Sequence, residues 1–152
     1  MNLEELKRKV KVLEDTEAIK NMHRDYIFWL RNSQFDEMID CFAENATAEI
    51  RTFGPRTGRN TIARLFKEEI AKVKIPRGHS LVQPVITVEG DKAKGHWTMY
   101  TFNYDYTAPV GMGRLMECEQ GRYDCEYVRE GGKWKFNFLK WICPWPEQQG
   151  QI

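Results

Sequence analysis

The sequence predicts an α+β fold in which helices come first and an antiparallel sheet follows. Through the first 42 positions, apolar residues recur every three or four residues, which is the spacing of amphipathic helices. After position 78, alternating runs rich in β-branched and aromatic residues are separated by Gly-containing turns. Helices that precede the strands, rather than alternating with them, are typical of α+β domains. We expect a single domain over residues 1–152.

Composition excludes several classes of function. The chain has 23 Lys and Arg residues against 22 Asp and Glu residues, a formal charge of +1, so no basic excess points to nucleic acid. No dense Lys/Arg run predicts a membrane surface, and no stretch approaches the roughly 18 apolar residues of a membrane span. The first residues are charged and amphipathic, unlike a secretion signal. We therefore expect a soluble cytoplasmic protein.

The first third of the chain is predicted to form three helices. Leu3 to about Asp15 has an apolar stripe at Leu3, Leu6, Val10 and Leu13. Thr16 is placed to cap a second helix, whose apolar residues include Ile19, Met22 and Tyr26, and Asn32-Ser33 ends it. A short third helix covers residues 35–42.

One strand and one more helix follow. Residues 43–46 predict a turn, and the alternation over 47–53 predicts a strand that Gly54-Pro55 and Gly58 terminate. Asn60 is a suitable N-cap for a helix that runs to Ile70, because its side chain can accept a hydrogen bond from the first turn.

Residues 76–103 predict the central hairpin, with Glu89-Gly90-Asp91 as its turn. One face of its second strand carries Ala93, Gly95, Trp97, Met99 and Thr101. The other face carries Lys94, His96, Thr98, Tyr100 and Phe102. Both faces bear bulky side chains, so we expect helices on one face and a partner chain on the other. A dimer or trimer of identical chains would supply that cover.

A second hairpin completes the predicted sheet. Residues 105–113 are rich in Gly and Pro and predict a loop at the open end of the sheet. Strands are expected over 115–129 and 134–143, joined by a turn at 130–133.

The histidines and cysteines indicate neither a metal site nor a cofactor. Cys41, Cys118, Cys125 and Cys143 contain no CxxC pair, and the three histidines are dispersed, so we expect reduced thiols and no bound metal. His79 is the one residue of the central hairpin that can exchange a proton near neutral pH from a mostly apolar face. It is the candidate acid/base; the alternative is an ordinary hydrogen-bonded histidine.

Three segments together resemble one known family. Residues 35–46 (FDEMIDCFAENA), 57–62 (TGRNTI) and 131–136 (GGKWKF) are similar to motifs of SnoaL-like proteins, which belong to the nuclear transport factor 2-like superfamily. The resemblance implies a cone-shaped α+β barrel, whose curved antiparallel or mixed sheet wraps around the N-terminal helices. Because this fold carries many activities, the resemblance alone says little about function.

Within that superfamily, the chain is most similar to the branch of scytalone dehydratase and bile-acid dehydratase. The resemblance implies a pocket in which His79 acts as general acid/base and Tyr26 polarises the substrate. It also places carboxylates at Arg31 and Thr101 and an arginine near Cys143. Two of these five expected residue types, His79 and Tyr26, are present.

These residues suggest a small-molecule lyase or isomerase of dehydratase-like or cyclase-like type. Its substrate would be small, cyclic, largely apolar, and anionic or enolisable, with Arg31 and Tyr26 stabilising an oxyanion. Asp105 is preferred over Asp25 as a replacement carboxylate, because Asp25 should point away from Tyr26. The remaining residues expected in the pocket are Trp97, Met99, Thr101, Trp141 and Cys143. The alternative is a non-catalytic module that binds a hydrophobic ligand or assists assembly.

Overall fold

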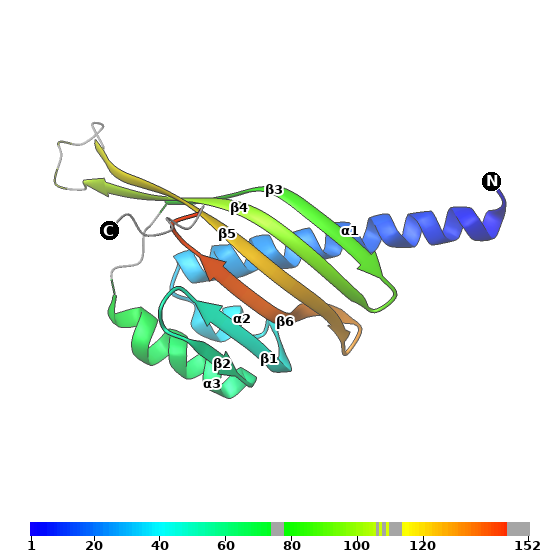
Figure 1. Cartoon of the computed structure of the whole chain (residues 1–152), viewed down its shortest axis with the longest axis horizontal. Helices are drawn as coiled ribbons and strands as arrows, with labels where there is room; N and C mark the ends of the chain where they lie inside the picture. Colours follow the sequence, from blue (N-terminus) through cyan, green and yellow to red (C-terminus); the bar gives the residue numbers. More distant parts are fainter. Residues whose placement is uncertain (74–77, 106, 108, 110–113, 146–152) are drawn as a thin grey trace, which may run out of the picture.

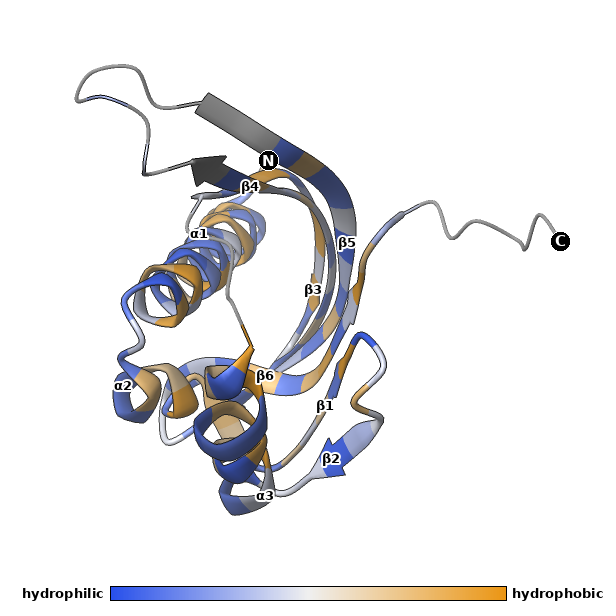
Figure 2. Ribbon diagram, turned by 90° about the vertical axis from the view of Figure 1, so that its left-hand side faces the viewer, coloured by the Kyte–Doolittle hydropathy of each residue, from blue (hydrophilic) through white to orange (hydrophobic). Residues whose placement is uncertain are grey.

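The computed structural model describes residues 1–73, 78–105, 107, 109 and 114–145, with only the backbone described at 104, 105 and 114–116. It confirms the predicted α+β architecture (Figure 1). Figure 2 shows the sheet curving around the helices, which lie on its concave side. Among the described residues, no helix is both long and apolar enough to cross a membrane.

The first helix is one continuous element, α1 (Leu3–Arg31), and not the two helices predicted. The side chain of Asn2 caps its start, accepting a hydrogen bond of 2.8 Å from the Glu5 amide. The Thr16 hydroxyl donates to the Val12 carbonyl at 2.7 Å, so it bonds back to the preceding turn and begins no new helix. The helix ends where predicted, at Asn32 and Ser33, the latter with a φ of 56°.

The next elements begin and end at other residues than predicted. After α2 (Phe35–Ile39) comes β1 (Phe42–Ile50), so the turn predicted at 43–46 is wrong. The pairing register shifts between Phe42 and Thr47, which lets the strand pass through this polar segment as an irregularity without a turn. The short β2 (Pro55–Thr57) pairs antiparallel with β1.

The helix predicted from Asn60 is present but is capped differently. Gly58 occupies the N-cap of α3 (Arg59–Arg64) with a φ of 89°, a conformation that glycine adopts without strain. Asn60 is therefore inside the helix and is not its cap. The helix continues as one π-helical turn (Leu65–Glu69) and a 3₁₀ turn (Ile70–Lys72).

The two predicted hairpins are confirmed. They consist of β3 (Gly78–Glu89) with β4 (Lys92–Asp105), and β5 (Arg114–Glu130) with β6 (Lys133–Ile142). The strand order is β2-β1-β6-β5-β4-β3. Neighbouring strands are antiparallel except β1 and β6, which run parallel. The last strand therefore lies in the middle of the sheet, between the first strand and β5.

The core lies between α1 and the concave face of the sheet. Trp97, Met99 and Thr101 of β4 are buried there, so the face that carries them is the one that meets the helices. The core is unusually aromatic around α1, and its fully buried rings belong to Tyr26, Phe42, Phe66, Tyr123, Tyr127 and Phe136.

A buried carboxylate fixes α1 to the sheet. Asp15 is 5% exposed and accepts hydrogen bonds from Arg129 at 2.5 Å and from the Trp134 indole at 3.1 Å. Lys11 contacts both of its carboxylate oxygens, at 2.9 and 3.0 Å. Burial alone raises the pKa of Asp15, but these three donors outweigh it and lower the pKa to about 2. The carboxylate is therefore charged at neutral pH and ties the middle of α1 to the β5–β6 hairpin.

Candidate functional site

A cavity of about 490 Å³ lies between the C-terminal half of α1, the end of β1 and the inner face of β3, β4 and β5. This volume is within the usual range for sites that bind small molecules. Its apolar wall includes Leu30, Phe66, Ile70, Met99 and Trp141. Its polar groups include Tyr26, Arg51, His79, Thr101, Glu119 and Tyr123. The cavity is thus a largely apolar space with several hydrogen-bonding groups in its wall.

Three of the polar residues form a row across the sheet. His79 on β3 pairs with Thr101 on β4, and Thr101 pairs in turn with Glu119 on β5. Side chains at directly paired positions lie on the same face of a sheet, with neighbouring Cβ atoms about 5 Å apart. The Nδ1 atom of His79 is buried, whereas the residue as a whole is half-buried. An imidazole, a hydroxyl and a carboxylate therefore line one wall.

Two phenols contribute to the cavity from opposite sides. Tyr26 of α1 and Tyr123 of β5 line it, and their hydroxyls are hydrogen-bonded to each other. Burial raises the pKa of both hydroxyls well above the ordinary value of 10.0. Both phenols are therefore neutral hydrogen-bond donors at physiological pH and cannot serve as bases there.

Arg51, directly after β1, forms an ion pair with Glu119 at the edge of the cavity. Arg51 has a φ of 45° and donates to Glu119 at 2.7 Å and to the Cys143 sulfur at 3.3 Å. Burial lowers the pKa of Arg51, but Glu119 and Cys143 raise it by more, and the guanidinium is charged. Burial raises the pKa of the Cys143 thiol to about 11, with Arg51 opposing and Glu119 adding to that shift. At neutral pH the group is an ion pair beside a neutral thiol.

Arg51 and Glu119 were not predicted from the sequence. The resemblance implied a carboxylate at position 101 and an arginine near position 143. In the structure, Glu119 is the strand partner of Thr101, and Arg51 is hydrogen-bonded to Cys143. Two of the three charges expected by resemblance, the carboxylate at 101 and the arginine near 143, thus have counterparts one contact away, on other segments.

The structure brings five of the predicted site residues to the cavity: Tyr26, His79, Met99, Thr101 and Trp141. Cys143 lies beside it through Arg51 and Glu119. Trp97 is buried in the core and donates its indole N–H to Tyr127 at 2.9 Å, so it is not among the cavity residues.

The predicted place of Arg31 is corrected. Arg31 is exposed at the end of α1 and is not among the residues that line the cavity. Residues five positions apart on a helix lie about 140° apart around its axis, so Arg31 and Tyr26 cannot share a face. Asp25 lies in a different hollow with Trp29 and Asp40, and it points away from Tyr26, as predicted. The Asp105 side chain lies outside the described residues.

The indole of Trp141 can lie in the cavity wall because residue 121 is a glycine and leaves room for the ring. A Cβ atom placed on Gly121 would lie 1.9 Å from Cη2 of Trp141, far inside contact distance. Only glycine allows the ring to lie over β5 at this point. The Trp141 ring also contacts Tyr123, with ring centres 4.5 Å apart.

A second imidazole, that of His23, lies in the core rather than in the cavity. His23 is 0% exposed, and its Nδ1 is 3.2 Å from the Tyr127 hydroxyl, to which Trp97 also donates. Among the described residues, its Nε2 has no hydrogen-bond partner. Burial lowers the pKa of His23 to about 3, so the ring is neutral. It cannot act as an acid/base near neutral pH.

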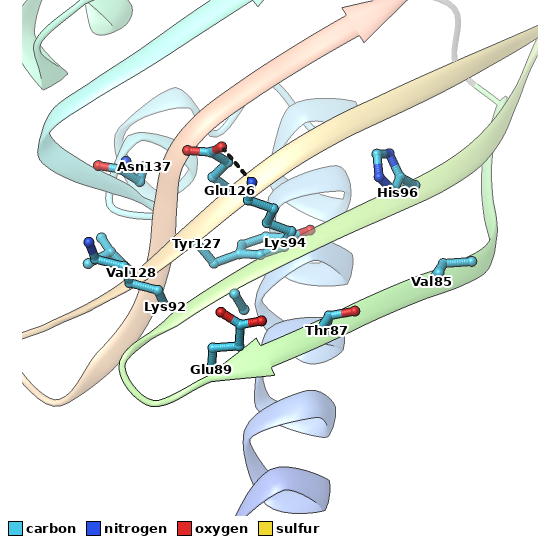
Figure 3. A pocket seen from close by; sticks show the side chains of 11 residues that line it. Val85, Thr87, Glu89, Lys92, Lys94, His96, Glu126, Tyr127, Val128 and Asn137 are labelled. Carbon is cyan, nitrogen blue, oxygen red and sulfur yellow. Dashed lines mark ion pairs between the residues drawn. The ribbon is translucent and has the colours of Figure 1, made fainter.

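The outer face of the sheet carries another hollow, of about 630 Å³ (Figure 3). Most of the side chains that line it are exposed or charged, among them Lys94 and Glu126, whose charged atoms are 3.8 Å apart. His96 also lines it and contacts Asp124 at 2.6 Å. Because most of these side chains are exposed, whereas the inner cavity is lined by buried residues such as Tyr26, Thr101 and Tyr123, the inner cavity is the better candidate site. No cluster of three or more potential metal ligands occurs among the described residues.

Comparison with known proteins gives one family and one fold. The SnoaL-like domain family matches residues 11–140. A comparison with curated proteins found no match. The solved structures similar to this chain include a protein of Novosphingobium aromaticivorans described as nuclear transport factor 2-like with a cystatin-like fold. It is 20% identical, with a TM-score of 0.71, over 92% of this chain and 88% of that one.

Two further structures carry the name of an activity. A presumed scytalone dehydratase of the same organism is 21% identical, with a TM-score of 0.67, over 86% of this chain and 85% of that one. A hexachlorocyclohexane dehydrochlorinase of type 2 is 19% identical, with a TM-score of 0.68, over 86% of each chain. At these identities the likeness establishes a shared fold. It agrees with the cone-shaped α+β architecture expected from the sequence.

Proposed function

Because the chain belongs to the SnoaL-like domain family, we propose that it is a lyase or isomerase that works by acid–base chemistry in the inner cavity. The substrate class is a small, largely apolar cyclic molecule with an acidic C–H bond beside a carbonyl or phenol. The observation that carries the proposal is the presence of His79 and Tyr26 in the wall of one cavity of about 490 Å³. The named dehydratase and dehydrochlorinase of this fold both eliminate a small molecule, which supports this reaction class.

In the proposed reaction, the neutral His79 imidazole removes the proton from the acidic carbon. In an isomerisation, the electron pair of that C–H bond is delocalised onto the adjacent carbonyl oxygen, which gives an enolate. In an elimination, the same pair forms a double bond to the neighbouring carbon, and the leaving group departs from that carbon. Imidazolium then returns the proton to the leaving group or to another carbon of the same molecule. An imidazole suits both steps because its ordinary pKa lies near neutrality.

The phenols are proposed to stabilise the developing oxyanion. The bond between Tyr26 and Tyr123 uses one of their two hydroxyl hydrogens, which leaves the other for the substrate oxygen. A neutral hydroxyl donates a stronger hydrogen bond to the negatively charged enolate oxygen than to the neutral ketone oxygen. It therefore stabilises the charge that develops during the reaction more than it stabilises the starting ketone. The high pKa of both hydroxyls keeps that hydrogen in place at physiological pH.

Arg51 and Glu119 take the role that the sequence had suggested for Arg31. Their ion pair at the cavity edge gives a fixed guanidinium for an anionic group of the substrate. Glu119 is also the strand partner of Thr101, which itself pairs with His79, so the Arg51–Glu119 ion pair is fixed on the same wall of the cavity as the imidazole.

One observation favours a second candidate, a module that binds a hydrophobic ligand without converting it. The two positions at which the resemblance implies carboxylates hold Arg31 and Thr101, and Arg31 does not reach the cavity. A site without a carboxylate in contact with the histidine would still bind an apolar molecule.

The test is hydrogen–deuterium exchange at acidic C–H positions of a panel of cyclic ketones and phenols, followed by NMR in D₂O. We expect exchange by the wild type to fall about 100-fold or more in His79→Gln, the loss typical of a missing general base. His96→Gln is the matched control, because His96 lies on the outer face. Tyr26→Phe should lower the rate with little change in KM, as expected for a donor used in the transition state.

The outcomes separate the two candidates. Equal exchange in wild type and His79→Gln would remove the histidine from the mechanism. Saturable binding of panel molecules with no exchange above the buffer rate would support the binding module.

A further inference from the structure

The first part of α1 extends beyond the sheet and carries an apolar stripe that the domain does not cover. Figure 1 shows the N-terminal turns projecting past the ends of the strands. Leu3, Leu6, Val10 and Leu13 are 64%, 43%, 43% and 69% exposed. Four large apolar side chains along one helical face form an exposed apolar patch, and such patches are typical of protein–protein interaction sites.

This stripe faces away from the body of the protein. At 100° per residue, its mean direction lies about 150° around the helix axis from that of the buried residues further along the same helix. Those buried residues are Asp15, Ile19, His23, Tyr26, Ile27 and Leu30. The stripe is therefore not an extension of the core-facing side of α1, and the protein's own sheet cannot cover it.

The spacing of the stripe is that of a coiled-coil seam. Steps of three, four and three residues place Leu3 and Val10 at heptad positions a, and Leu6 and Leu13 at positions d. Both d positions are leucine and one of the two a positions, Val10, is β-branched, a combination that favours a pair of parallel helices. The apolar seam stops at Glu17, the next a position, which is paired within its own helix with Lys20 and Arg24.

Charges beside the seam fit a second copy of the same helix. In a parallel, in-register pair, position g of one helix lies near position e of the next heptad in the other. Here g is Lys9, which pairs with Glu5 of its own helix at 3.2 Å, and e is Glu14, so a parallel pair would bring two symmetric Lys–Glu contacts together. The preceding g position is the uncharged Asn2, opposite Lys7, so no like charges meet across the pair.

We propose that α1 is an interaction surface for a second copy of this chain, which it binds as a parallel two-helix seam over residues 3–14. The rest of α1 is already folded onto the sheet, so the nucleation cost that makes short isolated helices unstable does not oppose the pairing. The core-facing sides of the two helices point outward, so the two domains lie on opposite sides. Residues 1–10 precede the segment that matches the SnoaL-like family, so most of this surface lies outside the shared domain.

The test is the dissociation constant of the dimer, measured by sedimentation equilibrium on the full chain over a range of concentrations. Leu6→Asp places a charge at the centre of the seam and should raise the dissociation constant at least about tenfold. Glu14→Lys should weaken the dimer because Lys9 then faces a lysine. The double variant Lys9→Glu with Glu14→Lys should restore it. Circular dichroism and thermal melting of each variant establish that the domain remains folded.

Val85→Lys is the matched control, because Val85 is 65% exposed on the outer face of the sheet, away from the seam. It should leave the dissociation constant unchanged. A wild type that remains monomeric at all concentrations would overturn the proposal, and so would a dimer that Val85→Lys dissociates and Leu6→Asp leaves intact. Failure of the double variant to restore what Glu14→Lys weakens would overturn the parallel register.

Discussion

We predict that the buried His23 makes the protein less stable as the pH falls from 7 to 5. The folded chain holds this imidazole neutral, with a pKa lowered by burial to about 3, whereas the unfolded chain binds a proton with the ordinary pKa of 6.5. Below pH 6.5 the unfolded state therefore binds more protons than the folded state, and stability is lost as the pH decreases toward 3.

The magnitude follows from those two values. At pH 7 the unfolded imidazole is mostly neutral, and at pH 5 it is almost fully protonated. Protonation of the unfolded chain alone then lowers the free energy of unfolding by about 2 kcal/mol between pH 7 and 5. The Asp15 carboxyl adds almost nothing in this window, because its pKa changes from 3.8 to about 2 on folding. Asp15 is therefore excluded from this window, and the comparison of wild type with a His23 variant isolates the contribution of that histidine.

The assay is urea unfolding at pH 7, 6 and 5, for wild type and for His23→Phe. Phenylalanine keeps the ring packing, and the Tyr127 hydroxyl keeps its bond from Trp97. Between pH 7 and 5, the free energy of unfolding of His23→Phe should change by about 2 kcal/mol less than that of the wild type. His23→Gln gives a second side chain that does not titrate, and His96→Gln controls for an exposed histidine. Equal pH dependence in wild type and both His23 variants would refute the reasoning.

Three further predictions concern residues around α1 and the cavity. Asp15→Asn should lower the free energy of unfolding by about 2 to 3 kcal/mol at pH 7, because Arg129 and Lys11 lose their buried counter-charge; denaturant unfolding measures it. Gly121→Ala should destabilise the fold by about 2 kcal/mol and displace Trp141, which tryptophan fluorescence and weaker binding of an apolar cavity ligand would report. Glu119→Gln should lower the Cys143 thiol pKa below about 11, because the carboxylate raises it; the pH dependence of alkylation in a Cys118→Ser background measures the change.

Much of the fold could be predicted because its signals are local. The alternation on both sides of Gly90 and of Gly131–Gly132 gave the two hairpins within one or two residues of their ends. The failures occurred where local signals are ambiguous. Thr16 suits an N-cap and also the middle of a helix, where its hydroxyl can bond to the preceding turn. Tertiary packing of α1 on the sheet decides between the two.

The candidate site could be predicted only in part. His79 and Tyr26 were identified through their resemblance to family positions, and they line one cavity. Arg51 and Glu119 are 68 positions apart in the sequence, and only the strand register and the bend after β1 bring them together. No spacing pattern in a single sequence encodes that contact. Arg31 was chosen by transfer of a family position, and its side chain is exposed at the end of α1, outside the set of residues that line the cavity.

The position of β6 has a consequence for how the chain can be made. In the part of the chain that the structure describes, strands β1 and β2 join the rest of the sheet only through this last strand, which pairs with β1 over residues about 90 positions earlier. While the protein is being synthesised, β1 can pair with β2, but its other edge stays unpaired until residues 133–142 have left the ribosome. Closure of the sheet is therefore a late event, and a chain truncated after Glu130 should expose its aromatic interior to chaperones and proteases.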